Sequence, residues 1–313
     1  MKKGWIALIV VVVGALLLLA VAAPIILLIL SIGGGSELGV GERIVVIRID
    51  GVISASGGDG LLVEGGTTPE IVLEQLREAD EDDRVKAVLV RINSPGGTPA
   101  AAQEIFRELK RTEKPVVTSV GDIAASAAYL LAAGTDRIVS SRASEVGSIG
   151  VIQVVPNLQE LYTKIGVENQ VITAGKFKDM FSGSRPLSEE ERELLDQDIQ
   201  IVYGQFIEDV AKGRRIPERK VRELATGQTF PGSEAIKLGL VDELGNYRDA
   251  VDLAAKMGKI KGEPELIEYG APSLLELITR TLQGRTIDLR DLFLPTDLFR
   301  IPSSMPRPEL PAR

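Results

Sequence analysis

The chain of 313 residues contains no histidine and no cysteine. Without histidine, it lacks the imidazole that activates the serine of most serine hydrolases. Without cysteine, it has no disulfide, no thiolate nucleophile and no cysteine ligand for a metal. A zinc hydrolase would have to bind its metal with carboxylates alone, so we expect neither a metal nor another cofactor. If a serine is the nucleophile here, lysine is the best-placed base.

Basic residues are too few and too scattered for a nucleic-acid-binding surface. The chain has 36 Lys and Arg against 44 Asp and Glu, a net charge of -8. Outside short mixed segments, no basic run is longer than Arg214-Arg215, so we expect no nucleic-acid partner. The composition, 44% hydrophobic and 26% charged, is that of a globular protein with one large domain or two small ones.

The first 32 residues predict a membrane anchor. No charged residue lies between Trp5 and Ile32, and a helix of this length spans about 42 Å, more than the roughly 30 Å hydrocarbon core of a bilayer. The apolar region of a signal peptide has about 7–15 residues, which favours a retained anchor over the alternative, a cleaved signal peptide. Lys2 and Lys3 precede the anchor and should stay cytoplasmic, with the rest of the chain on the extracytoplasmic side of the cell membrane. The expected parts are a cytoplasmic stub at 1–4, a transmembrane anchor at 5–32 and a linker at 33–42.

Strands and helices alternate in the rest of the chain. Short β-branched runs bounded by turn residues predict strands, at Arg43–Ile49, Lys86–Ile92, Pro115–Val120 and Arg137–Ser140. Apolar residues at helical spacing predict helices, at Pro69–Ala79, Pro99–Lys110, Ile123–Ala133 and Glu189–Lys212. This alternation indicates βαβ units around a largely parallel sheet.

Two loops contain candidate catalytic groups. Ser126 lies among small apolar residues at an expected strand-to-helix turn, where the N–H of Ala127 would lie beside the serine oxygen. Gly96 and Gly97 directly follow a predicted strand, and adjacent glycines let backbone N–H groups approach a ligand and form an oxyanion hole. The alternatives are a serine buried for packing and an ordinary strand-to-helix turn.

A third segment supplies the candidate base. Lys176 and Lys178 lie close together, and a lysine acts as a base only when neutral, which requires its pKa to fall by roughly 3 units from about 10.4. A solvated surface lysine is the alternative, and it fits Lys176 better than Lys178. Ser148, in a Gly-Ser turn, has a hydroxyl that could accept a hydrogen from the amine and orient its lone pair. Three neighbours offer an apolar setting for the lysine, Phe177, Met180 and Phe181.

In this order and spacing, the segments resemble the signal peptide peptidase A family, the membrane-anchored serine peptidases of the crotonase and Clp-protease superfamily. The resemblance extends from about Arg43 to Ala255. It implies an α/β fold, a crotonase/Clp-protease-like βαβ spiral domain at 43–262 behind an N-terminal transmembrane helix. A C-terminal extension with a proline-rich tail follows at 263–313. The motifs that carry the resemblance are Asn93–Gly97, Ala124–Ser126, Gly147–Val151, Gly175 with Lys178-Asp179, and Leu238–Gly245.

The resemblance also implies roles for single residues. Family members usually have Gly-Gly after the serine, whereas this chain has Ala127-Ala128; the backbone N–H is retained, but two methyl groups narrow the pocket. The implied roles are nucleophile for Ser126, general base for Lys178, orientation of the lysine for Ser148, and the oxyanion hole for Gly96, Gly97 and Ala127.

The implied function is that of a serine endopeptidase with a Ser/Lys dyad. Its substrates would be remnant signal peptides and other unfolded apolar peptides at the outer face of the membrane. The chain has one catalytic unit, as in the short family members, which implies a homo-oligomeric ring and a dyad formed within one subunit or between two. Three alternatives remain open: a Clp-like membrane protease for stomatin-type partners, a crotonase-type acyl-CoA enzyme, and a catalytically inactive scaffold.

Overall fold

The computed structural model describes residues 41–56 and 66–269 of the chain. The expected anchor at 5–32, most of the linker, and the tail from residue 270 lie outside the described residues. Within the described ranges, no helix combines the length and the apolar character needed to cross a membrane. The described residues belong to one compact unit, Gly39–Tyr269.

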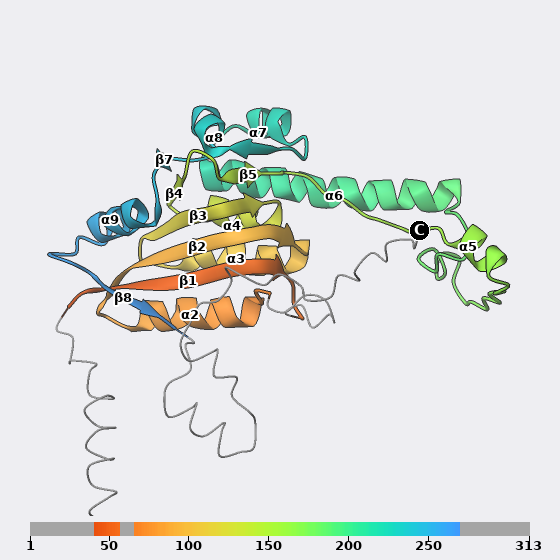
Figure 1. Cartoon of the computed structure of the whole chain (residues 1–313), viewed down its shortest axis with the longest axis horizontal. Helices are drawn as coiled ribbons and strands as arrows, with labels where there is room; N and C mark the ends of the chain where they lie inside the picture. The colour runs from red at the N-terminus through yellow and green to blue at the C-terminus, as the bar shows by residue number, and fades with distance from the viewer. Residues whose placement is uncertain (1–40, 57–65, 270–313) are drawn as a thin grey trace, which may run out of the picture. The chain divides into compact units, whose positions relative to one another are not determined.

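The described residues form a mixed α/β fold around one central sheet (Figure 1). The strand order is β6-β5-β3-β2-β1-β8, with β4 beside β3 and β7 beside β4. All pairs are parallel except β5 with β6. The strands are β1 Arg43–Ile53, β2 Val85–Gly97, β3 Val116–Ala125, β4 Arg137–Ser140, β5 Glu145–Gly147, β6 Thr229–Pro231, β7 Glu243–Leu244 and β8 Glu265–Glu268.

Helices cover both faces of this sheet. The larger cluster of buried side chains lies between one face and α2, α3, α4 and the C-terminal half of α6, and the smaller cluster lies between the other face and α9. Strands buried on both faces need an almost continuous apolar run, which explains the sequence of β1 up to Ile47. The helices are α2 Pro69–Glu81, α3 Pro99–Arg111, α4 Ala127–Ala133, α5 Gln159–Lys164, α6 Glu189–Arg214, α7 Glu218–Leu224, α8 Gly232–Leu238 and α9 Tyr247–Met257.

The expected elements are confirmed, with one correction. The helix predicted at Ile123–Ala133 begins only at Ala127. The residues before it extend β3, because Ile123 to Ala125 pair with β5, Ala125 opposite Gly147. Pairing within the sheet therefore overrides the helical preference of an alanine-rich segment, and Ser126 lies at the turn between strand and helix, where it was expected.

One part of the chain projects from the sheet. Residues 153–187, here called the arm, lead from β5 to the far end of α6 from the sheet and contain α5 (Figure 1). The C-terminal half of α6 is buried through Phe206, Ile207 and Val210, whereas its N-terminal half extends toward the arm. Several apolar side chains of the arm are exposed, Ile172 by as much as 98%. The arm is therefore held mainly by its own contacts and by the first turn of α6.

Candidate active site

Ser126 occupies the turn between β3 and α4 in a strained backbone conformation. Its φ is 52° and its ψ is -125°, a region that costs a residue other than glycine on the order of 1–3 kcal/mol. The turn is held on both sides: the Ser126 N–H donates to Gly147 O at 2.8 Å, and the Leu130 N–H donates to Ser126 O at 3.1 Å. Strain held in place by surrounding bonds is typical of functional positions.

Gly96 and Gly97, the last two residues of β2, lie directly against this turn. Gly96 has a φ of 114°, and a Cβ at this position would lie 2.9 Å from the Ser126 Cβ and 3.1 Å from the Ala127 nitrogen. A Cβ at Gly97 would lie 1.8 Å from the carbonyl oxygen of Ile53 on β1. Only glycine fits at either position, so the structure brings Gly96, Gly97, Ser126 and Ala127 together.

The N–H groups of these residues are not equally available. The Gly96 N–H donates to the Ser94 hydroxyl at 3.1 Å, and Ser94 is fully buried. Ala127 is the first residue of α4, where a backbone N–H has no partner within the helix. In this state Ala127 is the available donor, and Gly96 would have to share or leave its bond to Ser94. The sequence reading missed Ser94, although a serine two residues before a glycine was the available signal.

Ser148 faces the same cavity as Ser126. Its φ is 51°, and its hydroxyl donates to Gly227 O at 3.1 Å. A cavity of about 290 Å³ separates the two serines. Its walls include Gly150, Ile199, Tyr203 and Thr226. The structure therefore places the two predicted serine hydroxyls on one space, which is large enough to admit a side chain from outside.

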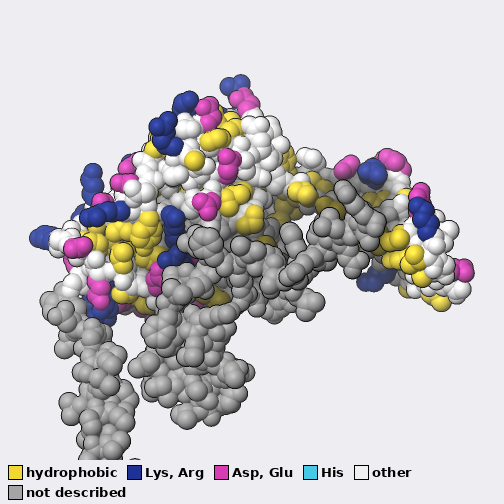
Figure 2. All heavy atoms as spheres, viewed as in Figure 1, with side chains coloured by type: hydrophobic (Ala, Val, Ile, Leu, Met, Phe, Trp, Pro, Cys, Tyr) yellow, Lys and Arg dark blue, Asp and Glu magenta, His cyan; other side chains and the backbone are white. Residues whose placement is uncertain are grey.

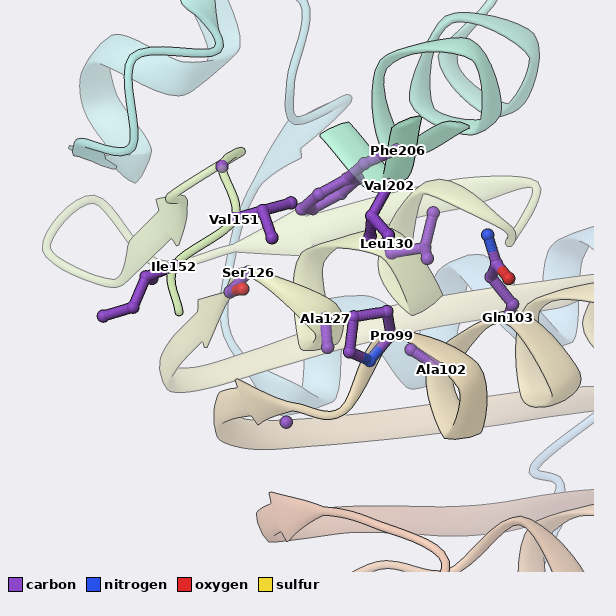
Figure 3. A pocket seen from close by; sticks show the side chains of 12 residues that line it. Pro99, Ala102, Gln103, Ser126, Ala127, Leu130, Val151, Ile152, Val202 and Phe206 are labelled. Atoms are coloured by element: carbon purple, nitrogen blue, oxygen red, sulfur yellow. The ribbon is translucent and has the colours of Figure 1, made fainter. Parts of the chain in front are cut away.

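A second, largely apolar cavity of about 120 Å³ begins at Ser126. Figure 3 shows Val151 and Phe206 on one side of it and Pro99 on the other, with the Ser126 hydroxyl at one end. Other lining residues are Ala102, Gln103, Ala127, Leu130 and Val202. An apolar pocket next to a candidate nucleophile is suited to an apolar substrate side chain.

Neither cavity contains a base other than the phenol of Tyr203. The described residues that line them include no Asp, Glu, Lys or Arg, and the Tyr203 hydroxyl donates to Ala225 O at 2.5 Å. Among the described residues, no group of three or more carboxylates could hold a metal ion. Apart from that phenol, no ionisable base lies beside the candidate nucleophile Ser126 in the part of the chain that the structure describes.

Lys178 lies elsewhere, on the arm. It is exposed, as is its neighbour Phe181 at 54%, so the expected apolar setting does not form within one chain. The segment lies at the far end of α6 from the sheet that holds Ser126 (Figure 1). Lys176, expected on the surface, is 66% exposed and pairs with Glu190. The structure thus brings together every predicted site residue except Lys178.

A group of three charged residues beside Lys178 was missed by the sequence reading. Arg185 binds both oxygens of Asp179, each at 2.9 Å, and both oxygens of Glu191, at 2.6 and 2.8 Å. The Arg185 guanidinium lowers the pKa of Asp179 and holds that of Glu191 at about 2. Glu191 is 2% exposed and also accepts from the Ser188 N–H in the capping box of α6. The spacing of six residues on either side of Arg185 was the only signal in the sequence.

Comparison with known proteins identifies the family. The model of Peptidase family S49 matches residues 108–261, a range that includes Ser126, Ser148 and Lys178. An Enterococcus faecium protein that carries the name signal peptide peptidase SppA is 36% identical over 231 residues, 73% of this chain and 67% of the relative. A Synechocystis sp. protein named as a protease is 37% identical over 253 residues, 80% of this chain and 86% of the relative. Protease 4 of Haemophilus influenzae is 35% identical over 222 residues, 70% of this chain but 35% of that longer protein.

Among solved structures, a mutant of the 1510-N membrane-bound stomatin-specific protease aligns with 74% of this chain and 98% of its own, at 14% identity and a TM-score of 0.49. A likeness of this size does not decide which partners this chain acts on. The relatives above, by contrast, are named as peptidases or proteases. The family is therefore one of peptidases, and neither of acyl-CoA enzymes nor of inactive scaffolds. This chain belongs to Peptidase family S49 and is a serine peptidase of the signal peptide peptidase SppA and protease 4 type.

Proposed function

We propose that this protein is a membrane-anchored endopeptidase in which Ser126 is the nucleophile and Lys178 of a neighbouring copy is the general base. One observation carries the proposal: Ser126 and Ser148 share a cavity whose described lining residues include no lysine, while Lys178 is exposed on a projecting arm. If the arm of a second chain places its Lys178 in this cavity, the serine gains a base and the exposed lysine gains a site. We also propose that this unit has the βαβ spiral fold of the crotonase and Clp-protease superfamily.

The chemistry is acyl transfer. The neutral amine of Lys178 removes the Ser126 proton as the serine oxygen attacks a peptide carbonyl, and the Ala127 N–H and the Gly96-Gly97 loop stabilise the oxyanion. The resulting ammonium then protonates the leaving amine, and the amine next activates the water that hydrolyses the acyl-enzyme. Ser148 orients the amine by accepting one of its hydrogens.

The arm supports assembly into a homo-oligomeric ring. Its exposed apolar side chains include Val154, Leu161, Ile165 and Ile172. Figure 2 shows apolar side chains at the surface of the arm, and exposed apolar groups that gather on one element favour an interaction surface. A head-to-tail contact repeated around a closed ring would place each arm on the next subunit. Burial against that subunit also favours the uncharged form of the Lys178 amine, the form that the mechanism requires.

The substrates are peptides with an apolar side chain before the cleaved bond. The cavity of about 120 Å³ beside Ser126 is lined mainly by apolar groups, and relatives carry the name signal peptide peptidase. Remnant signal peptides and other unfolded apolar segments fit this requirement. The anchor at 5–32, with the peptidase unit on the extracytoplasmic side, would hold the enzyme where such peptides are released and raise their local concentration.

The test is peptide hydrolysis by the full-length protein in detergent. Ser126→Ala and Lys178→Ala should each abolish cleavage of casein and of a signal peptide while leaving the assembly intact in size-exclusion chromatography. Lys176→Ala is the matched control, because Lys176 is two residues away and pairs with Glu190 on the surface; it should keep its activity. Full activity of Ser126→Ala or Lys178→Ala would remove that residue from the mechanism. A reporter fused after residue 313 that is active only in the cytoplasm would contradict the topology.

A further inference from the structure

The loop that carries Lys178 is fastened to the first turn of α6 by a double ion pair. Arg185 lies between Asp179, the residue after Lys178, and Glu191 of α6, and it makes two hydrogen bonds to each carboxylate. The side chains of Asp179 and Glu191 are only 18% and 3% exposed, and that of Arg185 is 36% exposed. Bidentate pairing to a partly buried guanidinium gives both strength and a fixed geometry.

This geometry controls which charges the lysine meets. Asp179 follows Lys178 directly in the chain, so an unpaired Asp179 carboxylate would be within reach of the amine and would stabilise its charged form. The bonds to Arg185 occupy both oxygens of that carboxylate and both oxygens of Glu191. The trio therefore carries one net negative charge instead of two, and each carboxylate already has a cation as its partner.

Other charged groups lie near the loop, on the arm and on the first turn of α6. Lys176 pairs with Glu190, and this pair is exposed to solvent, 66% and 56% respectively. Glu168 lines the same surface cavity as Asp179 and Arg185. The trio is held more closely than these groups. Asp179 and Arg185 belong to the loop itself, and Glu191 is buried on α6.

We infer that Arg185 is a positioning residue for Lys178: it fixes the loop on α6 and keeps Asp179 and Glu191 from pairing with the catalytic amine. This inference rests on the proposed function, in which Lys178 acts as the base. A purely structural ion pair would only hold the loop in place. A positioning residue would in addition set the pH at which the enzyme becomes active, because the charge of the trio acts on the amine.

The experiment measures kcat/KM against pH for the assembled full-length enzyme in detergent. Because Lys178 must lose a proton to act, activity rises with pH, and the position of this rise reports the trio's charge. Arg185→Gln leaves two negative charges and should move the rise to higher pH by roughly one unit. Asp179→Asn leaves none and should move it to lower pH. The double variant Arg185→Gln with Asp179→Asn keeps only the Glu191 carboxylate, so its net charge equals that of the wild-type trio. Its rise should return close to the original pH.

Lys212→Gln is the matched control, because it removes one cation from an exposed pair with Glu208 on the same helix; it should not move the rise. If Arg185→Gln and Asp179→Asn lower the melting temperature but leave the rise where it is, Arg185 is only structural and the inference is wrong. If Arg185→Gln does not assemble, Asp179→Asn decides alone, since Glu191 still holds the guanidinium. Full activity of Lys178→Ala would instead refute the proposed function, whichever way the Arg185 variants behave.

Discussion

Two inactive variants should restore activity to each other if the dyad forms between subunits. A Ser126→Ala subunit keeps Lys178 on its arm, and a Lys178→Ala subunit keeps Ser126 in its cavity. Neither substitution should unfold its own subunit, because Lys178 is exposed in the single chain and the Ser126 backbone bonds do not involve the hydroxyl. When the two variants occupy one ring, a complete site forms wherever an intact cavity meets an intact arm.

The size of the recovery follows from counting neighbours. In a random one-to-one mixture, half of the subunits carry Ser126 and half of the arms that reach them carry Lys178, so about one quarter of the sites are complete in a ring with one contact type. Co-expressing the two variants with different tags and purifying through both tags gives the mixed assembly for a casein or signal-peptide assay. A parallel mixture of Ser126→Ala with Lys176→Ala should reach about one half, since every arm then carries Lys178.

A dyad within one subunit gives a different result. The mixture of Ser126→Ala with Lys178→Ala would then stay inactive, while the Lys176→Ala mixture would still reach about one half. That outcome, with mixed rings confirmed by the two tags, would refute the reasoning from the exposed arm. It would mean instead that the arm folds back onto its own cavity.

Three other predictions test the packing and the charges around the site. Gly97→Ala places a methyl group 1.8 Å from a backbone oxygen and should lower the melting temperature and abolish hydrolysis. Gly204→Ala is the control, because a Cβ there meets open space; it should keep activity and raise the free energy of unfolding by up to about 1 kcal/mol. Ala102→Leu fills part of the apolar cavity beside the serine, so peptides with leucine before the cleaved bond should lose roughly 10-fold in kcat/KM relative to alanine peptides; an unchanged ratio would place that subsite elsewhere. The pKa of Glu191 is lowered by Arg185 from 4.5 to about 2, so the stability from this pair is complete above pH 4.5 and is lost as the pH falls toward 2. In urea titrations Glu191→Gln should therefore be less stable than wild type near neutral pH, and a difference that does not shrink in acid would contradict the pairing.

The sequence predicted most of the fold because buried parallel strands and amphipathic helices have distinct patterns. Its error at Ile123–Ala133 has a physical cause: alanine favours helix in isolation, and the pairing of Ala125 with Gly147 involves a strand 22 residues further along the chain. No local pattern contains that contact. The same pairing then determines where the turn at Ser126 falls.

The site was predictable where a motif reports a local constraint. Gly96 and Gly97 were identified as glycines that permit close approach, and the structure shows the approach to Ser126 and to Ile53. The Arg185 ion pairs were not predictable, because they depend on how the loop folds against α6. Lys178 shows a further limit: one folded chain does not bring it to Ser126, so its predicted role can only be tested in the assembly.

The two halves of the proposed dyad are held with different rigidity, and this difference has a consequence for regulation. Around Ser126, α4 is buried throughout, and glycines that admit no other residue lock the loop beside it. Around Lys178, the arm contacts little besides itself and the first turn of α6, so ordering it on a neighbour costs conformational entropy that the exposed apolar side chains must offset on burial. The nucleophile is then ready before assembly, while the base arrives only with a partner. A peptidase built in this way would not cleave as a single chain, and holding copies together in a membrane would raise the fraction that is active.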